Sequence, residues 1–319
     1  MVLTCPGNLP CLKPGRFWLP NVNVAGDAPK DYIRIYEYGH GRSSKRKTWP
    51  AHIAKVGHKY YPNESITEHL LTRIGQALGM NMAESQLMWF GRQLRFLSRY
   101  FLRHEREQLV HGAEIFGGHL EDQKFVAEVE AANQARNFFT FQFVEDALLD
   151  RFGETAEPLL DEFVRLLGFD AIVGNNDRHY YNWGVITDLG RRHPPRFAPI
   201  YDTARALYWN TTDADLINLA RDQNRREARV MKYVERCYPK IGWEGLESPN
   251  HYGLIRQIAR HRSSYRPVLT SLCPANLSRI VTDVIEGEFV GLISPVRSEF
   301  IAECLDRRAA MFQEALAGA

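Results

Sequence analysis

An aspartate and an asparagine five residues apart are the feature of this sequence that most restricts its fold. Asp177 and Asn182 lie in the segment Gly-Asn-Asn-Asp-Arg-His-Tyr-Tyr-Asn-Trp-Gly at 174–184. Two apolar runs follow, at 183–187 and 196–200, and the residues between them are rich in Asp, Gly, Arg and Pro. This pattern predicts a loop that leads into a β-hairpin. A further acidic residue, Asp202, comes directly after the second run.

This order of residues suits phosphoryl transfer. That reaction needs an acidic group to orient the attacking hydroxyl and oxygen ligands to hold magnesium against the nucleotide phosphates. Protein kinases place a catalytic aspartate five residues before a metal-binding asparagine, with a second metal-binding aspartate further on. We therefore interpret Asp177 as the catalytic residue and Asn182 and Asp202 as magnesium ligands. Each alone could be a turn residue or a helix N-cap, but their shared order favours the kinase interpretation.

The sequence before this loop predicts a place for nucleotide phosphates. Residues 31–38 and 49–56 have β-type sequences, and a polar, basic loop at 39–48 joins them. Kinases cover the phosphates with such a strand, loop and strand. Period-two alternation puts Lys55 on the face of Ile53, where a lysine is costly without an anionic partner. Nucleotide phosphates would supply that partner, although a lysine whose end reaches solvent is the alternative.

A helix is predicted over 64–78, with Ser65 as its N-cap and Gly79 as the residue that stops it. Glu68 on this helix is the candidate to pair with Lys55, as kinases require. Glu64 competes for that role, and the run from Ser65 to Glu68 also fits a capping box. Residues 85–90 and 93–101 are predicted to form a hairpin. Helices are predicted over 120–149, 157–172, 213–237, 250–261, 276–286 and 296–316.

Composition limits the expected partners and compartment. The chain of 319 residues has a formal net charge of +2, which makes no general case for nucleic-acid binding, and it shows no helix-turn-helix signature. No apolar run approaches the roughly 18 residues needed to span a membrane. The N-terminus does not have the pattern of a signal peptide. Five cysteines, spread far apart, are typical of reduced thiols. We therefore expect a cytoplasmic protein without a membrane or direct nucleic-acid partner.

Three segments carry a resemblance to a known family: the loop Gly-Asn-Asn-Asp-Arg-His-x-x-Asn, the run Ala-Pro-Ile-Tyr-Asp that ends at Asp202, and Ile-Ala-Lys at 53–55. They resemble the HipA family of bacterial Ser/Thr protein kinases, the toxin components of HipA/HipB-type toxin–antitoxin modules. The resemblance implies an α+β, two-lobed, protein-kinase-like fold with a small β-rich N-lobe and a large helical C-lobe. We expect an irregular N-terminal arm at 1–30, a nucleotide-binding N-lobe at 31–105, and a C-lobe at 106–319 that carries the catalytic and metal-binding loops.

The resemblance also implies further nucleotide-binding residues. The family's adenine-binding hinge falls on 97–101, where Ser98 and Tyr100 are the candidates, although Tyr100 could belong to the core. His179 corresponds to a residue near the phosphates in the family, and a purely structural histidine fits the sequence almost as well. In the family, the loop equivalent to 39–48 is mobile and carries an inhibitory autophosphorylated serine. Neither Ser43 nor Ser44 is assigned to that role.

The implied reaction is transfer of the ATP γ-phosphoryl group, with Mg²⁺, to a Ser or Thr of a protein such as an aminoacyl-tRNA synthetase. A separately encoded antitoxin is the expected partner. Because only about 30 residues precede the first predicted strand, we expect much of the N-terminal subdomain of longer HipA proteins to be missing. Three alternatives remain: a small-molecule or lipid kinase of related fold, an inactive kinase-like binding module, and a member of a DNA-associated complex.

Overall fold

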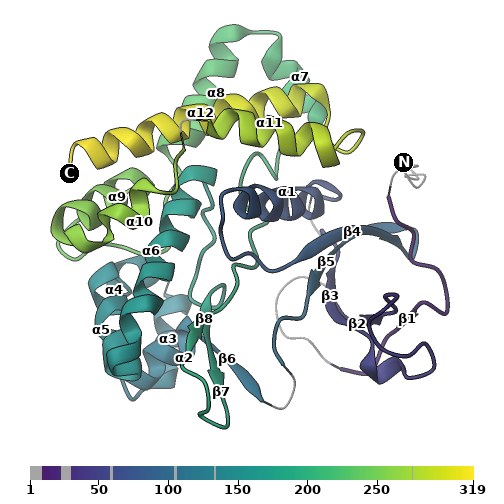
Figure 1. The fold of residues 1–319 in the computed structure, drawn as a ribbon. Coiled ribbons are helices and arrows are strands. Elements are labelled where there is room, and N and C mark those ends of the chain that lie inside the picture. Colours follow the sequence, from purple (N-terminus) through teal and green to yellow (C-terminus); the bar gives the residue numbers. More distant parts are fainter. Residues whose placement is uncertain (1–8, 23–29, 58–59, 104–105, 133, 275) are drawn as a thin grey trace.

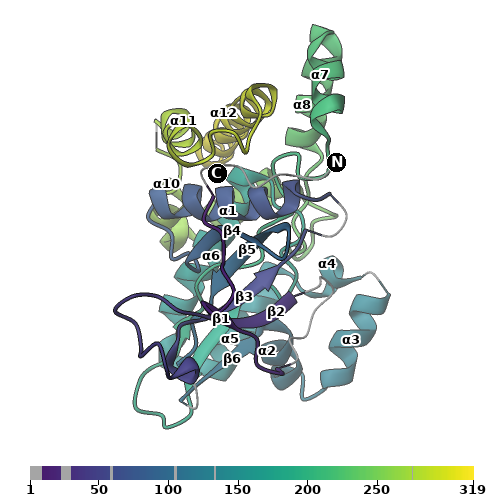
Figure 2. The ribbon, with the colours of Figure 1, turned by 90° about the vertical axis from the view of Figure 1, so that its right-hand side faces the viewer.

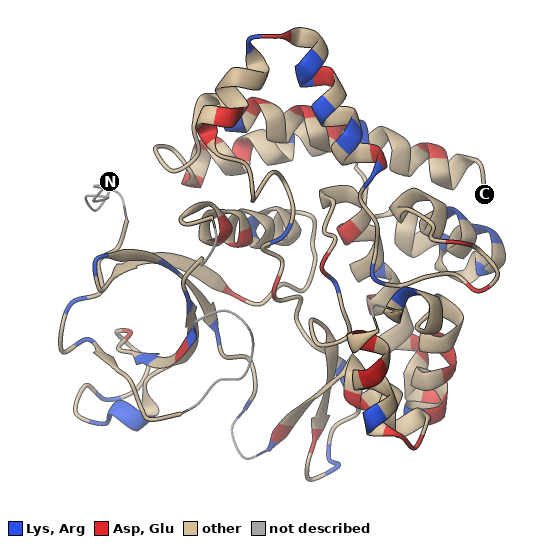
Figure 3. Ribbon diagram, turned by 180° about the vertical axis from the view of Figure 1, so that it is seen from behind, with Lys and Arg blue, Asp and Glu red and all other residues tan. Residues whose placement is uncertain are grey.

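Two lobes of different composition make up the structure, a computed structural model. It describes residues 9–22, 30–57, 60–103, 106–132, 134–274 and 276–319. Figure 1 shows a smaller lobe built on a curled β-sheet beside a larger lobe that is mostly helical. Lys and Arg are interspersed with Asp and Glu over both lobes (Figure 3). Among the helices that the structure describes, none combines the length and apolar character needed to cross a membrane.

The smaller lobe contains one antiparallel sheet. Within the described residues its order is β1-β2-β3-β5-β4. The strands are β1 (Phe17–Trp18), β2 (Lys30–Ile35), β3 (Ala51–Lys55), β4 (Ser85–Phe90) and β5 (Gln93–Arg99). The hairpin predicted at 85–101 is therefore present. Part of the predicted irregular arm is ordered instead, because Phe17 and Trp18 pair with Ile35 and Arg34 of β2.

The register of this sheet divides its side chains between two faces. Lys30 pairs with Lys55, and Lys55 pairs with Phe96. Directly opposed residues share a face, so Lys30 and Lys55 lie on the same side. The opposite side buries a small apolar cluster that includes Ile33, Ala54 and Leu97. Helix α1 (Asn63–Ala77) packs against β4 and β5 (Figure 2). It covers the lysine-bearing side, because Lys55 contacts Glu68 on this helix.

Helix α1 matches the predicted helix at 64–78, except at its start. Its N-cap is Pro62, so Ser65 lies within the helix and the predicted N-cap is wrong. Proline suits a helix start, because its ring restricts φ and it has no N–H to satisfy. The Ser65 hydroxyl instead accepts the backbone N–H of Gly57 at 3.2 Å. Gly79 has a φ of +74° just after the helix, the left-handed conformation expected of a helix stop.

The larger lobe is built around α6 (Ala156–Val173), most of whose residues are buried. The helix predicted at 120–149 is divided into α3 (Gln123–Ala131), α4 (Ala135–Phe138) and α5 (Phe141–Phe152). The cause is local capping, since Asp122 and Thr140 accept backbone N–H groups at the starts of α3 and α5. Asp222 likewise divides the helix predicted at 213–237 into α7 (Asp213–Ala220) and α8 (Gln223–Glu235). Figure 2 shows α7 and α8 projecting from the lobe.

The remaining helices complete this lobe. The predicted helices at 250–261, 276–286 and 296–316 correspond to α9 (His251–His261), α11 (Leu277–Glu288) and α12 (Pro295–Ala317). Among the residues that the structure describes, helices α2 (Gly112–His119) and α10 (Arg266–Thr270) were not predicted. Short 3₁₀ turns are η1 (Arg46–Thr48), η2 (Gly153–Thr155) and η3 (Ser263–Tyr265).

A second sheet positions the catalytic-type loop. In the described part of the chain its order is β6 (Glu107–His111), β7 (Gly184–Asp188) and β8 (Arg196–Phe197). The predicted hairpin is β7 and β8, although β8 ends at Phe197 rather than at residue 200. The sequence pattern does not indicate β6, because the strand begins within a run of charged residues at 103–107. It pairs with β7, far along the chain, with His111 opposite Gly184.

Gly184 is a position where this pairing leaves no room for a side chain. A Cβ there would lie 2.5 Å from the Val110 carbonyl oxygen, a backbone atom that cannot move independently. We expect Gly184→Ala to lower the free energy of unfolding in urea by about 1–3 kcal/mol through overpacking. Gly287→Ala is the matched control, because a Cβ there meets nothing within 4 Å. Equal stability of Gly184→Ala and wild type would contradict the β6–β7 register.

Candidate active site

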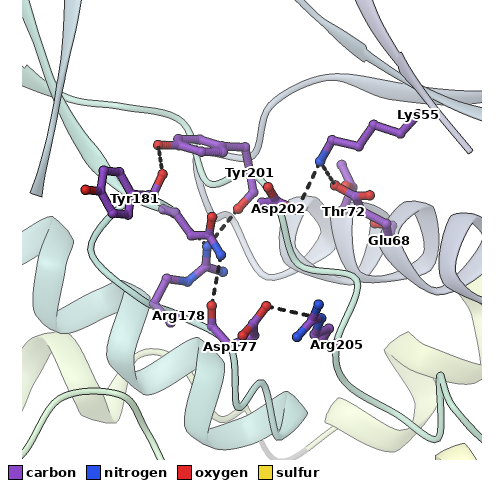
Figure 4. Close-up of polar contacts among 10 residues, drawn as sticks. Lys55, Glu68, Thr72, Asp177, Arg178, Tyr181, Tyr201, Asp202 and Arg205 are labelled. Atoms are coloured by element: carbon purple, nitrogen blue, oxygen red, sulfur yellow. Dashed lines mark hydrogen bonds and ion pairs between the residues drawn. The ribbon is translucent and has the colours of Figure 1, made fainter. Parts of the chain in front are cut away.

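One lysine joins the two lobes at the centre of the site. The Nζ atom of Lys55, at the end of β3, lies 2.8 Å from Oε1 of Glu68 on α1. The same Nζ lies 3.0 Å from Oδ1 of Asp202, which follows β8 in the other lobe. Figure 4 shows both contacts converging on the lysine. Glu68 is thus the partner of Lys55, as predicted, and it does not act as the capping-box residue of α1.

The charges of these three groups are strongly coupled. Burial alone would lower the pKa of Lys55, but Asp202 and Glu68 raise it above its ordinary value. Burial would raise the pKa of Asp202, yet the neighbouring Lys55 lowers it to about 2. Burial does raise the pKa of Glu68, against the opposing effect of Lys55. At neutral pH Lys55 is therefore a cation and Asp202 an anion.

The loop after α6 is held by a buried arginine. Arg178 is 2% exposed and forms a two-point contact with Asp170 of α6, Nε to Oδ2 at 2.9 Å and Nη2 to Oδ1 at 3.2 Å. Its Nη1 donates to the carbonyl oxygens of Asn182 at 2.8 Å and Tyr201 at 2.7 Å. One side chain therefore fixes the spacing between Asn182 and the residue before Asp202.

Backbone contacts position Asp177 within this loop. Its N–H donates to the Asn175 side-chain oxygen at 3.1 Å, and its carbonyl accepts the Asn182 amide at 2.9 Å. The side chain of Asp177 is 21% exposed, and its Oδ2 lies 3.2 Å from Nε of Arg205. The loop thus holds the backbone of Asp177 on both sides while its carboxylate stays accessible.

Asn182 and Asp202 have the donor chemistry that magnesium prefers, a side-chain amide oxygen and a carboxylate. Asn182 directs its amide nitrogen to Asp177, so its amide oxygen lies on the other side of the group. Lys55 contacts Oδ1 of Asp202, and the carboxylate has a second oxygen. Asp202 has a φ of 56°, a left-handed conformation that Asp and Asn tolerate better than most residues. These residues would fit Mg²⁺ between the loop and β3.

The other predicted nucleotide-binding residues lie around this centre. Ser98 is buried within β5, opposite Ile53, and so shares the face of Lys55. Tyr100 donates its backbone N–H to the Ala51 carbonyl at 2.8 Å, and its ring meets Tyr32 edge-on at 5.5 Å. His179 accepts the Tyr181 N–H at its Nδ1 at 3.3 Å, a contact within the loop. Ser43 and Ser44 are exposed in the loop between β2 and β3.

Lys30 is a candidate that the sequence analysis missed. It lies opposite Lys55 on the neighbouring strand β2. Burial raises the pKa of Glu68, and Lys30 opposes this effect together with Lys55. Against the effect of burial, Lys55 and, to a smaller extent, Lys30 lower the pKa of Asp202, so Lys30 acts on the same centre. Lys30 is the last residue of the predicted irregular arm, but the alternation of Lys30, Tyr32 and Arg34 is also typical of side chains on one face of a strand.

The chain is similar to known proteins over most of its length. The family model described as HipA-like C-terminal domain matches residues 22–264. The serine/threonine-protein kinase CtkA of Helicobacter pylori is 21% identical over 248 residues, which cover 78% of this chain and 70% of that protein. The crystal structure of the H. pylori proinflammatory kinase CtkA matches with a TM-score of 0.71 and 18% identity, over 93% of each chain.

A second solved structure is the Shewanella oneidensis toxin–antitoxin complex of HipA, HipB and operator DNA. It matches with a TM-score of 0.55 and 16% identity, over 94% of this chain and 67% of that one. Both structures share the fold of this chain. The predicted α+β, two-lobed, kinase-like architecture is therefore confirmed.

The Lys55–Asp202 ion pair should make stability depend on acidic pH. The folded-state pKa of Asp202 is about 2, below the value of roughly 3.9 in an unfolded chain. Ionised Asp202 therefore stabilises the fold above about pH 4, and this contribution is lost as the pH falls towards 2. Asp202→Asn should be less stable than wild type in urea at pH 6, with a difference that shrinks towards pH 2.

The asparagine variant keeps the tolerance for positive φ, so backbone strain does not enter this comparison. Asp283→Asn is the control, because Asp283 forms only an exposed pair with Arg279 on α11. Its stability difference from wild type should stay near zero throughout. A difference for Asp202→Asn that is constant between pH 6 and pH 2 would contradict the role of the ion pair.

Proposed function

The chain belongs to the HipA-like C-terminal domain family, and on that premise we propose that it is a Ser/Thr protein kinase that uses ATP and Mg²⁺. The observation that carries the proposal is the contact of Lys55 with both Glu68 and Asp202. Kinases need the lysine–glutamate pair and the metal-binding aspartate in place together. In this chain the ammonium group of Lys55 contacts both the glutamate and the aspartate. The loop with the Asp177–Asn182 spacing belongs to the same site.

Each residue has a defined task in the proposed reaction. Lys55 and Lys30 balance the negative charge of the nucleotide phosphates. Asn182 and Asp202 would hold Mg²⁺, which neutralises charge on the phosphates when bound. Asp177 orients the acceptor hydroxyl and accepts its proton. The hydroxyl oxygen bonds to the γ-phosphorus, while the bond from that phosphorus to the bridging oxygen breaks and its electron pair leaves with ADP.

The acceptor in this proposal is a Ser or Thr hydroxyl of a protein. Its support is the relative that is named a serine/threonine-protein kinase. A toxin role with a separately encoded antitoxin is supported by the HipA neighbour, which is bound to HipB. That complex also contains operator DNA. We keep the prediction that this chain itself makes no direct DNA contact, since its net charge is only +2 and charges of both signs are mixed.

Asp177→Asn tests the proposed chemistry. Lys55, Asn182 and Asp202 remain in this variant, so the dissociation constant for Mg²⁺–ATP should stay within a few-fold of wild type. The rate of phosphate transfer should fall by about 10²-fold or more, a typical contribution of a general base. Labelling of lysate proteins with radioactive ATP, beside calorimetric ATP binding, measures both quantities. Any growth inhibition by the overexpressed wild type should disappear in the variant.

The outcomes separate the alternatives. Wild-type labelling by Asp177→Asn would remove Asp177 from the mechanism. Tight ATP binding by wild type, with labelled small molecules or lipids instead of proteins, would make the chain a small-molecule or lipid kinase. Binding without transfer to any acceptor would make it an inactive binding module.

The two lysines of the sheet should contribute unequally to ATP binding. Lys55→Ala removes a cation that contacts two carboxylates directly, and should weaken binding of Mg²⁺–ATP by tenfold or more, since charge-assisted contacts are worth about 1.5–3 kcal/mol. Lys30→Ala should weaken binding by about two- to tenfold. Lys13→Ala, at an exposed position of the same lobe, is the control. Unchanged affinity in Lys30→Ala would exclude Lys30 from the nucleotide site.

A further inference from the structure

We propose that Arg205 is a further catalytic residue, which contacts the phosphoryl group as it passes from ATP to the acceptor. This inference rests on the proposed kinase function. Arg205 lies three residues after Asp202, and its Nε is 3.2 Å from Oδ2 of Asp177. It therefore joins the segment that carries a proposed metal ligand to the proposed base. Figure 4 shows Asp177 between Arg178 and Arg205, with Lys55 and Asp202 on the other side of the site.

The other arginine of the loop cannot serve in this way. Every guanidinium nitrogen of Arg178 already donates to Asp170 or to the carbonyls of Asn182 and Tyr201, and the residue is 2% exposed. The ring of His179 contacts the loop itself, since its Nδ1 accepts the Tyr181 N–H. Arg205, with a side chain that is 44% exposed, is the accessible cation in contact with Asp177.

The chemistry of the reaction favours an arginine at this point. Negative charge spreads over the equatorial oxygens of the transferring group in the transition state, and an arginine supplied by the same chain can stabilise it. The planar guanidinium has five N–H donors, and its geometry matches both carboxylates and phosphates. Its Nε can therefore keep the contact with Asp177 while its terminal N–H groups face the phosphoryl oxygens.

The surrounding structure holds Arg205 in place. Its guanidinium lies over the ring of Trp209, 5.5 Å from the centroid, and that ring meets Tyr60 edge-on at 5.3 Å. The chain turns sharply on both sides, since Asp202, Leu207 and Tyr208 have φ values of 56°, 50° and 60°. Such conformations persist only where the surroundings enforce them, and they concentrate at functional sites. Leu207 and Tyr208 are buried, at 0% and 1% exposure, and fix the chain just after Arg205.

The same contact could instead act as a gate that blocks Asp177 until an acceptor displaces the arginine. The two roles predict opposite effects of removing the charge. A catalytic cation makes the variant slower, whereas a gate makes it faster. The ordered position over Trp209 favours the catalytic role, which is the one that we propose.

Arg205→Gln and Arg205→Lys, in the full chain, test the inference. Initial rates of protein labelling are measured over a range of ATP concentrations, with the acceptor fixed. We expect kcat to fall by about 10²-fold or more in Arg205→Gln, with the KM for ATP within a few-fold of wild type. Arg205→Lys should be intermediate, because it keeps the charge but not the planar fork. Arg221→Gln, an exposed arginine at the end of α7, is the control and should match wild type.

Two further measurements separate catalysis from structure. Added guanidinium ion, at concentrations that leave the fold intact, should restore part of the activity of Arg205→Ala. Trp209→Leu removes the ring under the guanidinium and should lower kcat less than Arg205→Gln does. A lower melting temperature, a raised ATP dissociation constant and no rescue would together make Arg205 structural and overturn the inference.

The remaining outcomes are equally decisive. Full or increased activity of Arg205→Gln, beside an active wild type, would overturn the role of Arg205 and leave the proposed function intact. Absence of phosphate transfer by wild type, despite ATP binding, would overturn the proposed function and this inference with it.

Discussion

The site depends on the buried ion pair between Arg178 and Asp170. The two side chains are 2% and 1% exposed, and the arginine also binds the carbonyls of Asn182 and Tyr201. Removing one partner of such a pair leaves an uncompensated buried charge, at a cost of about 3–5 kcal/mol. A buried ion pair does not by itself add much net stability. Here it fixes the relative positions of three segments. The helix α6, the Asp177 loop and the strand before Asp202 cannot move independently of one another.

A second buried arginine extends this constraint to the end of the chain. Arg308 on α12 donates to the carbonyls of Ala171 and Ile172 in α6 and to those of Tyr233 and Val234 in α8. These carbonyls belong to the last turns of their helices, which carry partial negative charge. A cation is therefore favourable there without a carboxylate. Because α6 ends at Val173 and its C-cap Gly174 begins the catalytic-type loop, helix α12 supports the site from a distance.

The sequence predicted what short-range pattern encodes. The spacing of Asp177, Asn182 and Asp202 lies within one loop and hairpin. The kinase requirement for a lysine–glutamate pair indicated Glu68 as the partner of Lys55, with Glu64 as its competitor, and the structure shows the contact with Glu68. Prediction from the sequence failed where contacts between distant segments determine the structure. Strand β6 is stabilised by its pairing with β7, which is distant in the sequence. The charged residues at its start do not indicate a strand. Lys30 became part of the site only through the β2–β3 register, and Arg205 only through the turn after Asp202. Arg205 has no local signal of its own, and the alternation at 30, 32 and 34 indicates a strand face for Lys30 but not the neighbouring strand that carries Lys55.

The balance of charge at the site suggests how its ligands bind. Three acidic and three basic side chains are assigned to the site: Glu68, Asp177, Asp202, Lys30, Lys55 and Arg205. Magnesium bound alone would be repelled by the three basic side chains, and a nucleotide bound alone would be repelled by the three carboxylates. Each ligand removes the repulsion that the other creates, so the two should bind with positive coupling, and by linkage the coupling is reciprocal. Burial is the main cause of the raised pKa of Glu68, and Asp202 adds to it. A bound cation near Asp202 would offset the contribution of Asp202, whereas the contribution of burial would remain.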